Sequence, residues 1–95
     1  MQKSIKNERP MYKLLVLDID GTLTDSAKKI SRTTKRALRR AQNKGVKIVL
    51  ASGRPTPGIV PVAEELGFAE HGGYILSFNG GKIIDYKTGK TIFES

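Results

Sequence analysis

The sequence contains no cysteine and no long apolar run. Without cysteine, disulfide bonds and thiolate metal sites are excluded, and a reducing, cytoplasmic location is expected. No segment approaches the roughly 20 apolar residues of a membrane-spanning helix, so we expect no membrane partner. Residues 1–10 are polar and basic and lack the apolar stretch of a secretory signal. We interpret them as a basic, disordered leader, unless translation starts at Met11.

Acidic residues are also scarce, at nine against seventeen lysines and arginines, which gives a net charge of +8. Much of the excess lies between Lys28 and Lys44. Three interpretations are open: contact with nucleic acid, a solvated helix face, or acidic surface that lies outside this chain. We favour the helix face, because no aromatic residue lies among these charges to stack on bases. Nucleic acid is therefore not an expected partner.

Apolar runs alternate with helical patterns along the 95 residues, a length that suits one small domain. Residues 12–17 and 46–51 are short apolar runs of the kind found in buried parallel strands. Ser31 is the expected N-cap of a helix between them, and Gly45 is expected to follow the end of that helix.

A second helix and three further strands are predicted after the second apolar run. The helix starts near Pro57, because proline suits a first helical turn, and it ends at Gly67. Strands are expected at residues 74–78, 82–86 and 90–94, of which the last two form a hairpin. We therefore predict a Rossmann-like α/β domain with three parallel strands, crossover helices and a C-terminal β-hairpin.

A polar loop follows each of the three predicted parallel strands. Asp18 follows the first strand, Ser52 the second and Asn79 the third. Ligands of such sheets bind beyond the carboxyl ends of the strands. The order of the elements therefore predicts that these three loops meet at one edge of the sheet.

Asp18 and Asp20 are the strongest chemical signal in the chain. In extended geometry residues i and i+2 point the same way, so two like charges would be held close together and attract a cation. Such hard oxygen ligands suit Mg²⁺. One carboxylate can attack phosphorus and the other can exchange a proton with the leaving oxygen. Gly21 and Thr22 offer backbone N–H groups to a phosphate. The alternative is a surface Asp-Gly turn.

Ser52, Gly53 and Arg54 lie between the second strand and the second helix. A hydroxyl and free N–H groups near a helix N-terminus form an anion site. This loop is therefore a candidate phosphate-binding loop, although a simple turn is the alternative when it is taken alone. Arg54 either adds charge to the phosphate pocket or has a structural role at the helix end. Asn79 and Gly80 are either substrate contacts or a hairpin turn.

The segment Asp18-Ile19-Asp20-Gly21-Thr22 resembles the first motif, DxDGT, of the haloacid dehalogenase (HAD) superfamily of phosphohydrolases. The resemblance implies that Asp18 is the nucleophile and Asp20 the general acid/base. It also implies that the Asp18 carboxylate and the Asp20 backbone carbonyl bind Mg²⁺.

The segment Ser52-Gly53-Arg54-Pro55 resembles the second motif in the form typical of the Cof-type branch of that superfamily. This branch acts mostly on sugar phosphates and other small phosphorylated metabolites. Asn79-Gly80 resembles the Asn-Gly pair that the branch carries after its third strand.

The resemblance implies a Mg²⁺-dependent phosphatase that hydrolyses a small phosphorylated metabolite through an aspartyl-phosphate. It covers residues 11–95 and only the front part of the family's pattern, so the cap domain, a catalytic Lys and a late acidic motif are expected to be missing. By themselves these residues are expected to lack turnover and to self-associate through the first strand, beside which the family places later strands. The alternative function is non-catalytic binding of phosphate or nucleic acid by the same half-domain.

Overall fold

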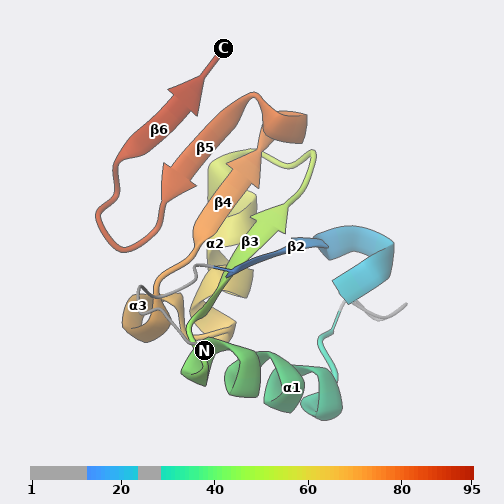
Figure 1. The fold of residues 1–95 in the computed structure, drawn as a ribbon. Helices are drawn as coiled ribbons and strands as arrows, with labels where there is room; N and C mark the ends of the chain where they lie inside the picture. The colour runs from blue at the N-terminus through green and yellow to red at the C-terminus, as the bar shows by residue number, and fades with distance from the viewer. Residues whose placement is uncertain (1–12, 24–28) are drawn as a thin grey trace.

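A computed structural model describes residues 13–23 and 29–95 (Figure 1). Within these residues one sheet has the strand order β2-β3-β4-β5-β6. Its parallel strands are β2 (Lys13–Asp18), β3 (Val46–Ala51) and β4 (Tyr74–Ser77), and its antiparallel hairpin consists of β5 (Lys82–Asp85) and β6 (Thr91–Glu94). The predicted α/β architecture is therefore confirmed. The leader predicted at residues 1–10 lies outside the described residues.

The helix between β2 and β3 has the ends that the sequence predicts. Helix α1 spans Arg32–Asn43, and the Oγ of its N-cap residue Ser31 accepts a hydrogen bond of 3.1 Å from the backbone N–H of Thr34. Gly45 follows the helix with a φ of +91°, a conformation that favours glycine. Local chemistry at each end therefore accounts for the length of α1.

Two helices lie between β3 and β4. Helix α2 spans Thr56–Glu65 and starts one residue before the predicted first-turn proline. The short helix α3, Phe68–His71, was not predicted. Phe68 is fully buried, and its ring meets the edge of Tyr86 with the centroids 5.8 Å apart. Long-range packing of this kind, rather than local propensity, accounts for α3.

A buried amide connects the first two helices. The side-chain amide of Gln42, near the end of α1, donates through Nε2 to the carbonyl of Leu66, just after α2, at 3.0 Å. Gln42 is 8% exposed, so this hydrogen bond is shielded from water. A buried amide without a partner is costly, so the contact favours one relative placement of the two helices.

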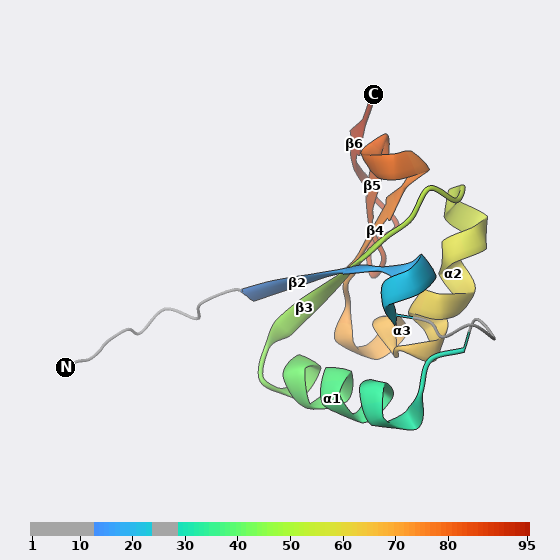
Figure 2. The ribbon, with the colours of Figure 1, turned by 90° about the vertical axis from the view of Figure 1, so that its right-hand side faces the viewer.

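The helices pack on one face of the sheet (Figure 2). On that face Ile48 and Leu50 of β3 and Ile75 of β4 are at most 1% exposed and belong to the main apolar core. Alternate strand residues point to the opposite face. There Leu14 and Val16 of β2 are 61% and 60% exposed, so the described part of the chain leaves this end of the face open to solvent.

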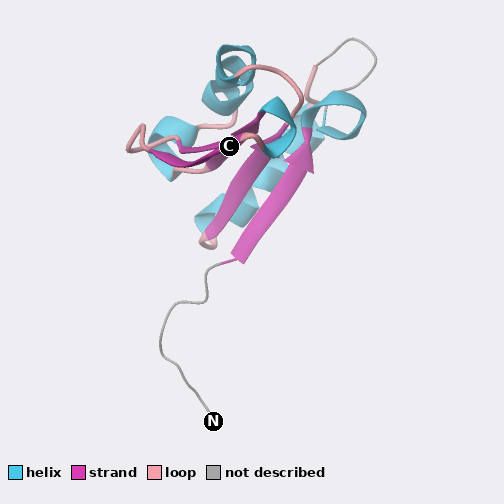
Figure 3. Cartoon of the chain, turned by 90° about the horizontal axis from the view of Figure 1, so that it is seen from above, coloured by secondary structure: helices cyan, strands magenta, loops and turns pink. Residues whose placement is uncertain are grey.

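Strand β2 is exposed in the described part of the chain, as the family resemblance implies, although its apolar sequence is typical of a buried strand. It lies at the end of the sheet order and pairs with β3 alone among the described strands (Figure 3). Leu15, on the helix-covered face, is still 37% exposed. Continuous apolar strands are normally buried because they have neighbours on both edges and cover on both faces. The free edge of β2 instead presents N–H and C=O groups that are open to pairing with another chain.

We expect the chain to self-associate through the free edge of β2. Val16→Lys should shift the population toward monomer, because a charge on an edge strand opposes pairing between chains. Sedimentation velocity over a range of concentrations measures this shift. Ile92→Lys in the other edge strand is the matched control, since Ile92 is 58% and Val16 60% exposed. A wild-type chain that stays monomeric at every concentration would contradict the prediction.

Candidate functional site

The loops that follow β3 and β4 are hydrogen-bonded to each other. The backbone N–H of Asn79 donates to the carbonyl of Ser52 at 3.1 Å, and the N–H of Phe78 donates to the carbonyl of Arg54 at 3.0 Å. These bonds join main chain to main chain. The second and third loops therefore form one connected surface beyond the carboxyl ends of their strands.

The loop that follows β2 starts at the same edge. Asp18, the last residue of β2, is aligned with Ala51, the last residue of β3, and Ser52 comes next. Ala51 is in turn aligned with Leu76, one residue before the end of β4. The three loops therefore meet at one edge of the sheet, as the order of elements predicts.

Directly after Asp18 the chain winds into η1, a single π-helical turn over Ile19–Leu23. Ile19 is fully buried and Leu23 is 6% exposed, so these two residues anchor the turn in the core. Extended geometry therefore ends at Asp18, and the expectation that Asp18 and Asp20 share a side as residues i and i+2 of a strand is wrong. The turn also carries the backbone of the predicted phosphate-contacting residues, Gly21 and Thr22.

The side chain of Arg54 connects the second loop to this turn. Its Nη2 lies 2.7 Å from Oδ1 of Asp20, and its Nη1 donates to the carbonyl of Gly58 in α2 at 3.0 Å. The side chains of Arg54 and Asp20 are 32% and 51% exposed, so solvent reaches the ion pair. The sequence leaves two roles open for Arg54, a phosphate contact and a structural role at the helix end, and the bond to Gly58 fits the second. The sequence gives no sign of the contact with Asp20.

Ser52 and Gly53 form the start of the second loop, directly after β3. Ser52 is 6% exposed, and its Oγ accepts a hydrogen bond of 3.0 Å from the backbone N–H of Arg54. The helix α2 follows, and its N-cap residue Pro55 makes no side-chain cap. A Cβ at Gly53 would lie 3.1 Å from Oδ1 of Asn79, so glycine lets the Asn79 side chain lie against this loop. Uncapped N–H groups at a helix start favour an anion.

The third loop departs from the predicted strand. Strand β4 ends at Ser77, and Phe78–Gly80 form the 3₁₀ turn η2. Phe78 and Asn79 both have a φ of +53°, a region that bulky side chains rarely adopt. The ring of Phe78 is 50% exposed. In the sequence Phe78 continues the apolar run of the strand, so the turn is not evident there. The Asn-Gly pair at its end is the one local signal.

The site offers oxygen ligands without a dense cluster of metal-binding side chains. Among residues 13–23 and 29–95, no three or more His, Cys, Asp or Glu side chains are grouped so that they could hold a metal ion. Asp18 and Asp20 contribute carboxylates within one short segment. A donor set of this kind fits Mg²⁺, which often binds one or two carboxylates and keeps several waters.

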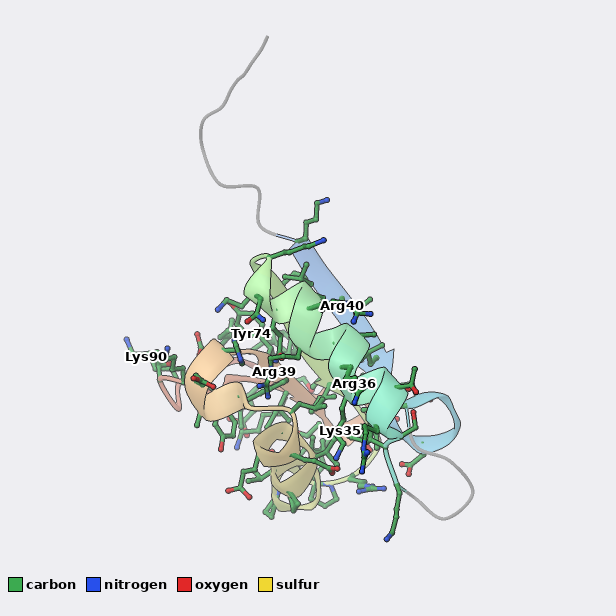
Figure 4. All side chains as sticks on the ribbon, turned by 90° about the horizontal axis from the view of Figure 1, so that it is seen from below. Lys35, Arg36, Arg39, Arg40, Tyr74 and Lys90 are labelled. Carbon is green, nitrogen blue, oxygen red and sulfur yellow. The ribbon has the colours of Figure 1, made fainter. Side chains whose placement is uncertain are left out.

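The basic side chains of α1 are a separate feature (Figure 4). Arg36, Arg39 and Arg40 are exposed, and Lys35 forms an ion pair of 3.0 Å with Glu65. The helix itself contains no aromatic residue. These are the features of a solvated helix face. In the described part of the chain, no helix combines the length and apolarity that crossing a membrane requires.

Comparison with known proteins identifies the family. A sequence model of the family described as haloacid dehalogenase-like hydrolase matches residues 15–95. This chain belongs to the haloacid dehalogenase-like hydrolases. The family resemblance carried by residues 18–22 is therefore confirmed.

Relatives and solved structures agree with this family. The chain is 36% identical over 73 residues to phosphatase YwpJ of Bacillus subtilis, covering 77% of this chain and 25% of the relative. It is 42% identical over 71 residues to a phosphoglycolate phosphatase of Picrophilus torridus, covering 75% and 28%. A haloacid dehalogenase-like hydrolase from Bacteroides thetaiotaomicron has a similar structure, with a TM-score of 0.84, 55% identity and coverage of 88% of this chain and 32% of that one.

The match is confined to part of each relative. The chain spans between 25% and 32% of the length of these curated relatives. The comparisons therefore establish the family over residues 15–95 and the fold of the described residues. The individual roles of Asp18, Asp20, Ser52 and Asn79 stay predictions.

We expect only weak, sequence-blind binding of nucleic acid by the basic side of α1. Exposed arginines attract phosphate backbones, but the helix has no aromatic residue on which a base can stack. Titration of labelled duplex and single-stranded DNA at physiological salt measures the affinity. Submicromolar binding that disappears on reversing the charges of Arg36, Arg39 and Arg40 would make the chain a binding module instead.

Proposed function

We propose that this chain provides the nucleophile and phosphate-binding loops of a Mg²⁺-dependent phosphatase that acts on a small phosphorylated metabolite. The observation that carries the proposal is the alignment of Asp18 with the end of β3, directly before Ser52. This alignment puts the Asp18 carboxylate and the candidate phosphate-binding loop at one edge of the sheet. Membership of a hydrolase family supports a hydrolytic reaction at that edge.

In the proposed reaction Asp18 acts as the nucleophile. One oxygen of its carboxylate bonds to phosphorus while the bond from phosphorus to the leaving oxygen breaks, which gives an aspartyl-phosphate. Asp20 donates a proton to the leaving oxygen and later removes one from the water that attacks phosphorus. Cleavage of the aspartyl-phosphate then releases inorganic phosphate and restores Asp18.

The phosphoryl group is proposed to lie between the first two loops. The hydroxyl of Ser52 and the backbone N–H of Gly53 are donors on one side, near the uncapped start of α2. The backbone N–H groups of Gly21 and Thr22 are the proposed donors on the other. Donors fixed in the backbone need little reorganisation when charge develops on the phosphoryl oxygens.

Mg²⁺ is the proposed cofactor. The Asp18 carboxylate and the Asp20 backbone carbonyl would hold it, which leaves the Asp20 carboxylate to handle the proton. The bound cation would offset the negative charge of the phosphoryl oxygens. The oxygen donors of this segment support the assignment, since Mg²⁺ prefers hard ligands and few carboxylates.

We propose a sugar phosphate or a similar metabolite as the substrate. The Ser-Gly-Arg-Pro motif of the Cof type supports this class. A sugar phosphatase of HAD subclass IIB also has a similar structure, with a TM-score of 0.73 and 33% identity, covering 87% of this chain and 31% of that one. Asn79 and Gly80, which follow β4 at the same edge, are the proposed substrate contacts.

Asp18→Asn should abolish phosphoenzyme formation in the intact protein, because an amide is a poor nucleophile toward phosphorus. The measurement is mass spectrometry of acid-quenched protein after incubation with a phosphate donor and Mg²⁺. Asp85→Asn is the control, since Asp85 lies in the hairpin and its Oδ1 accepts hydrogen bonds from the backbone N–H groups of Lys87 and Thr88. A phosphoryl adduct that persists in the Asp18 variant, or that maps to another residue, would exclude Asp18 as the nucleophile.

Asp20→Asn should slow turnover of the intact protein by roughly 10²–10⁴-fold, the usual effect of losing acid/base assistance. Steady-state phosphate release measures this loss. Glu65→Gln serves as the matched control, because Glu65 is also an exposed carboxylate in an ion pair. Turnover that is equal in the wild type and the Asp20 variant would rule out proton transfer by Asp20.

A further inference from the structure

Arg54 is held at four points around the proposed site. Its backbone N–H donates to Oγ of Ser52, and its carbonyl accepts from the N–H of Phe78, each at 3.0 Å. Its side chain contacts Oδ1 of Asp20 through Nη2 and the carbonyl of Gly58 through Nη1. The residue therefore connects all three polar loops with the first turn of α2.

The close approach of Gly58 helps to fix the direction of this side chain. A Cβ at Gly58 would lie 3.4 Å from Cβ and Cδ of Arg54, so the aliphatic part of the arginine lies directly over the glycine backbone. Because one Nη is held by the Gly58 carbonyl, the other is presented to Asp20. Because the guanidinium is planar and rigid, fixing Nη1 also limits the positions that Nη2 can take.

Asp20 is bonded through one of its two carboxylate oxygens. The contact to Arg54 is made by Oδ1, and in the described residues Oδ2 has no hydrogen-bond or ion-pair partner. Both side chains are partly exposed, and ion pairs of this kind add little to stability. Orientation of the carboxylate is therefore the more important consequence of the contact.

We propose that Arg54 is a positioning residue that holds Asp20 through Oδ1 and leaves Oδ2 to exchange the proton with the leaving oxygen and with water. This inference rests on the proposed function of Asp20. It assigns Arg54 to the acid/base group, whereas the Ser-Gly-Arg motif alone assigns it to the phosphate. If Arg54 positions Asp20, removing the guanidinium impairs proton transfer. If Arg54 binds the phosphate, removing it weakens substrate binding.

A kinetic double-mutant cycle in the intact protein separates these assignments. Arg54→Met should lower kcat on the order of 10²-fold, as misplacement of a reacting group does, with KM changed by less than about twofold. In the Asp20→Asn background the same change should add less than about twofold, because the group that it positions is already lost. A raised KM, or effects that multiply in the double variant, would show that Arg54 binds the phosphate and would overturn the proposal.

Lys35→Met is the matched control for the loss of an exposed cation from an ion pair. Lys35 contacts Glu65 at 3.0 Å, and the two side chains are 41% and 43% exposed, comparable with the Arg54 pair. The control should leave kcat and KM unchanged. A loss in this variant equal to that of Arg54→Met would mean that ion-pair removal acts through general stability, which would also overturn the proposal.

A spectroscopic measurement tests the contact without relying on activity. The ¹⁵N–¹H signals of the Arg54 Nη2 group, which contacts Asp20, should show restricted rotation about the Cζ–Nη2 bond in the wild type, faster rotation in Asp20→Asn and unchanged rotation in Glu65→Gln. Free rotation of the Nη2 group in the wild type would overturn the proposal directly. An intact protein with restricted rotation but no phosphatase activity would instead overturn the proposed function, and with it the positioning role, while the contact itself stands.

Discussion

Parallel pairing of β2 with β3, and of β3 with β4, brings the ends of three strands to one edge of the sheet. The alignment of Asp18 with Ala51, and of Ala51 with Leu76, determines how far apart the three loops start. Side chains more than thirty positions apart, such as Asp20 and Arg54, meet because of this register. A shift of one residue would turn every strand side chain to the other face and would separate the loops from the core that supports them. The proposed chemistry therefore depends on strand pairing before it depends on any one side chain.

Elements governed by local chemistry could be predicted from the sequence. Ser31 and Gly45 indicate the ends of α1 in the sequence. In the structure the Ser31 hydroxyl caps the helix and Gly45 follows it with a positive φ. Residues 46–51 form a strand with the predicted bounds. The family could also be predicted, because residues 18–22 join a short motif to the apolar strand that must precede it. In each case the local sequence carries a recognisable signal for the element.

Features governed by distant contacts could not be predicted. The four-residue helix α3 depends on burial of Phe68 against Tyr86. The exposure of β2 is expected only from the family resemblance, because its own apolar sequence is typical of a buried strand. The turn at Ile19–Leu23 replaces an extended segment because Ile19 is drawn into the core. The ion pair of Arg54 could not be predicted either, because its partner Asp20 lies in another loop, 34 positions away in the sequence. The candidate residues were therefore predictable as a set, but their mutual contacts were not.

The loops are joined by two kinds of interaction that respond differently to the solution. Backbone hydrogen bonds hold the loop containing Ser52 to the loop containing Asn79, and such bonds carry no net charge. The contact of η1 with Arg54 is ionic and partly exposed, so dissolved salt screens it. Rising ionic strength therefore loosens the hold of Arg54 on Asp20 while the other two loops stay together. A salt concentration that leaves the fold intact can therefore make the position of the Asp20 side chain less well defined.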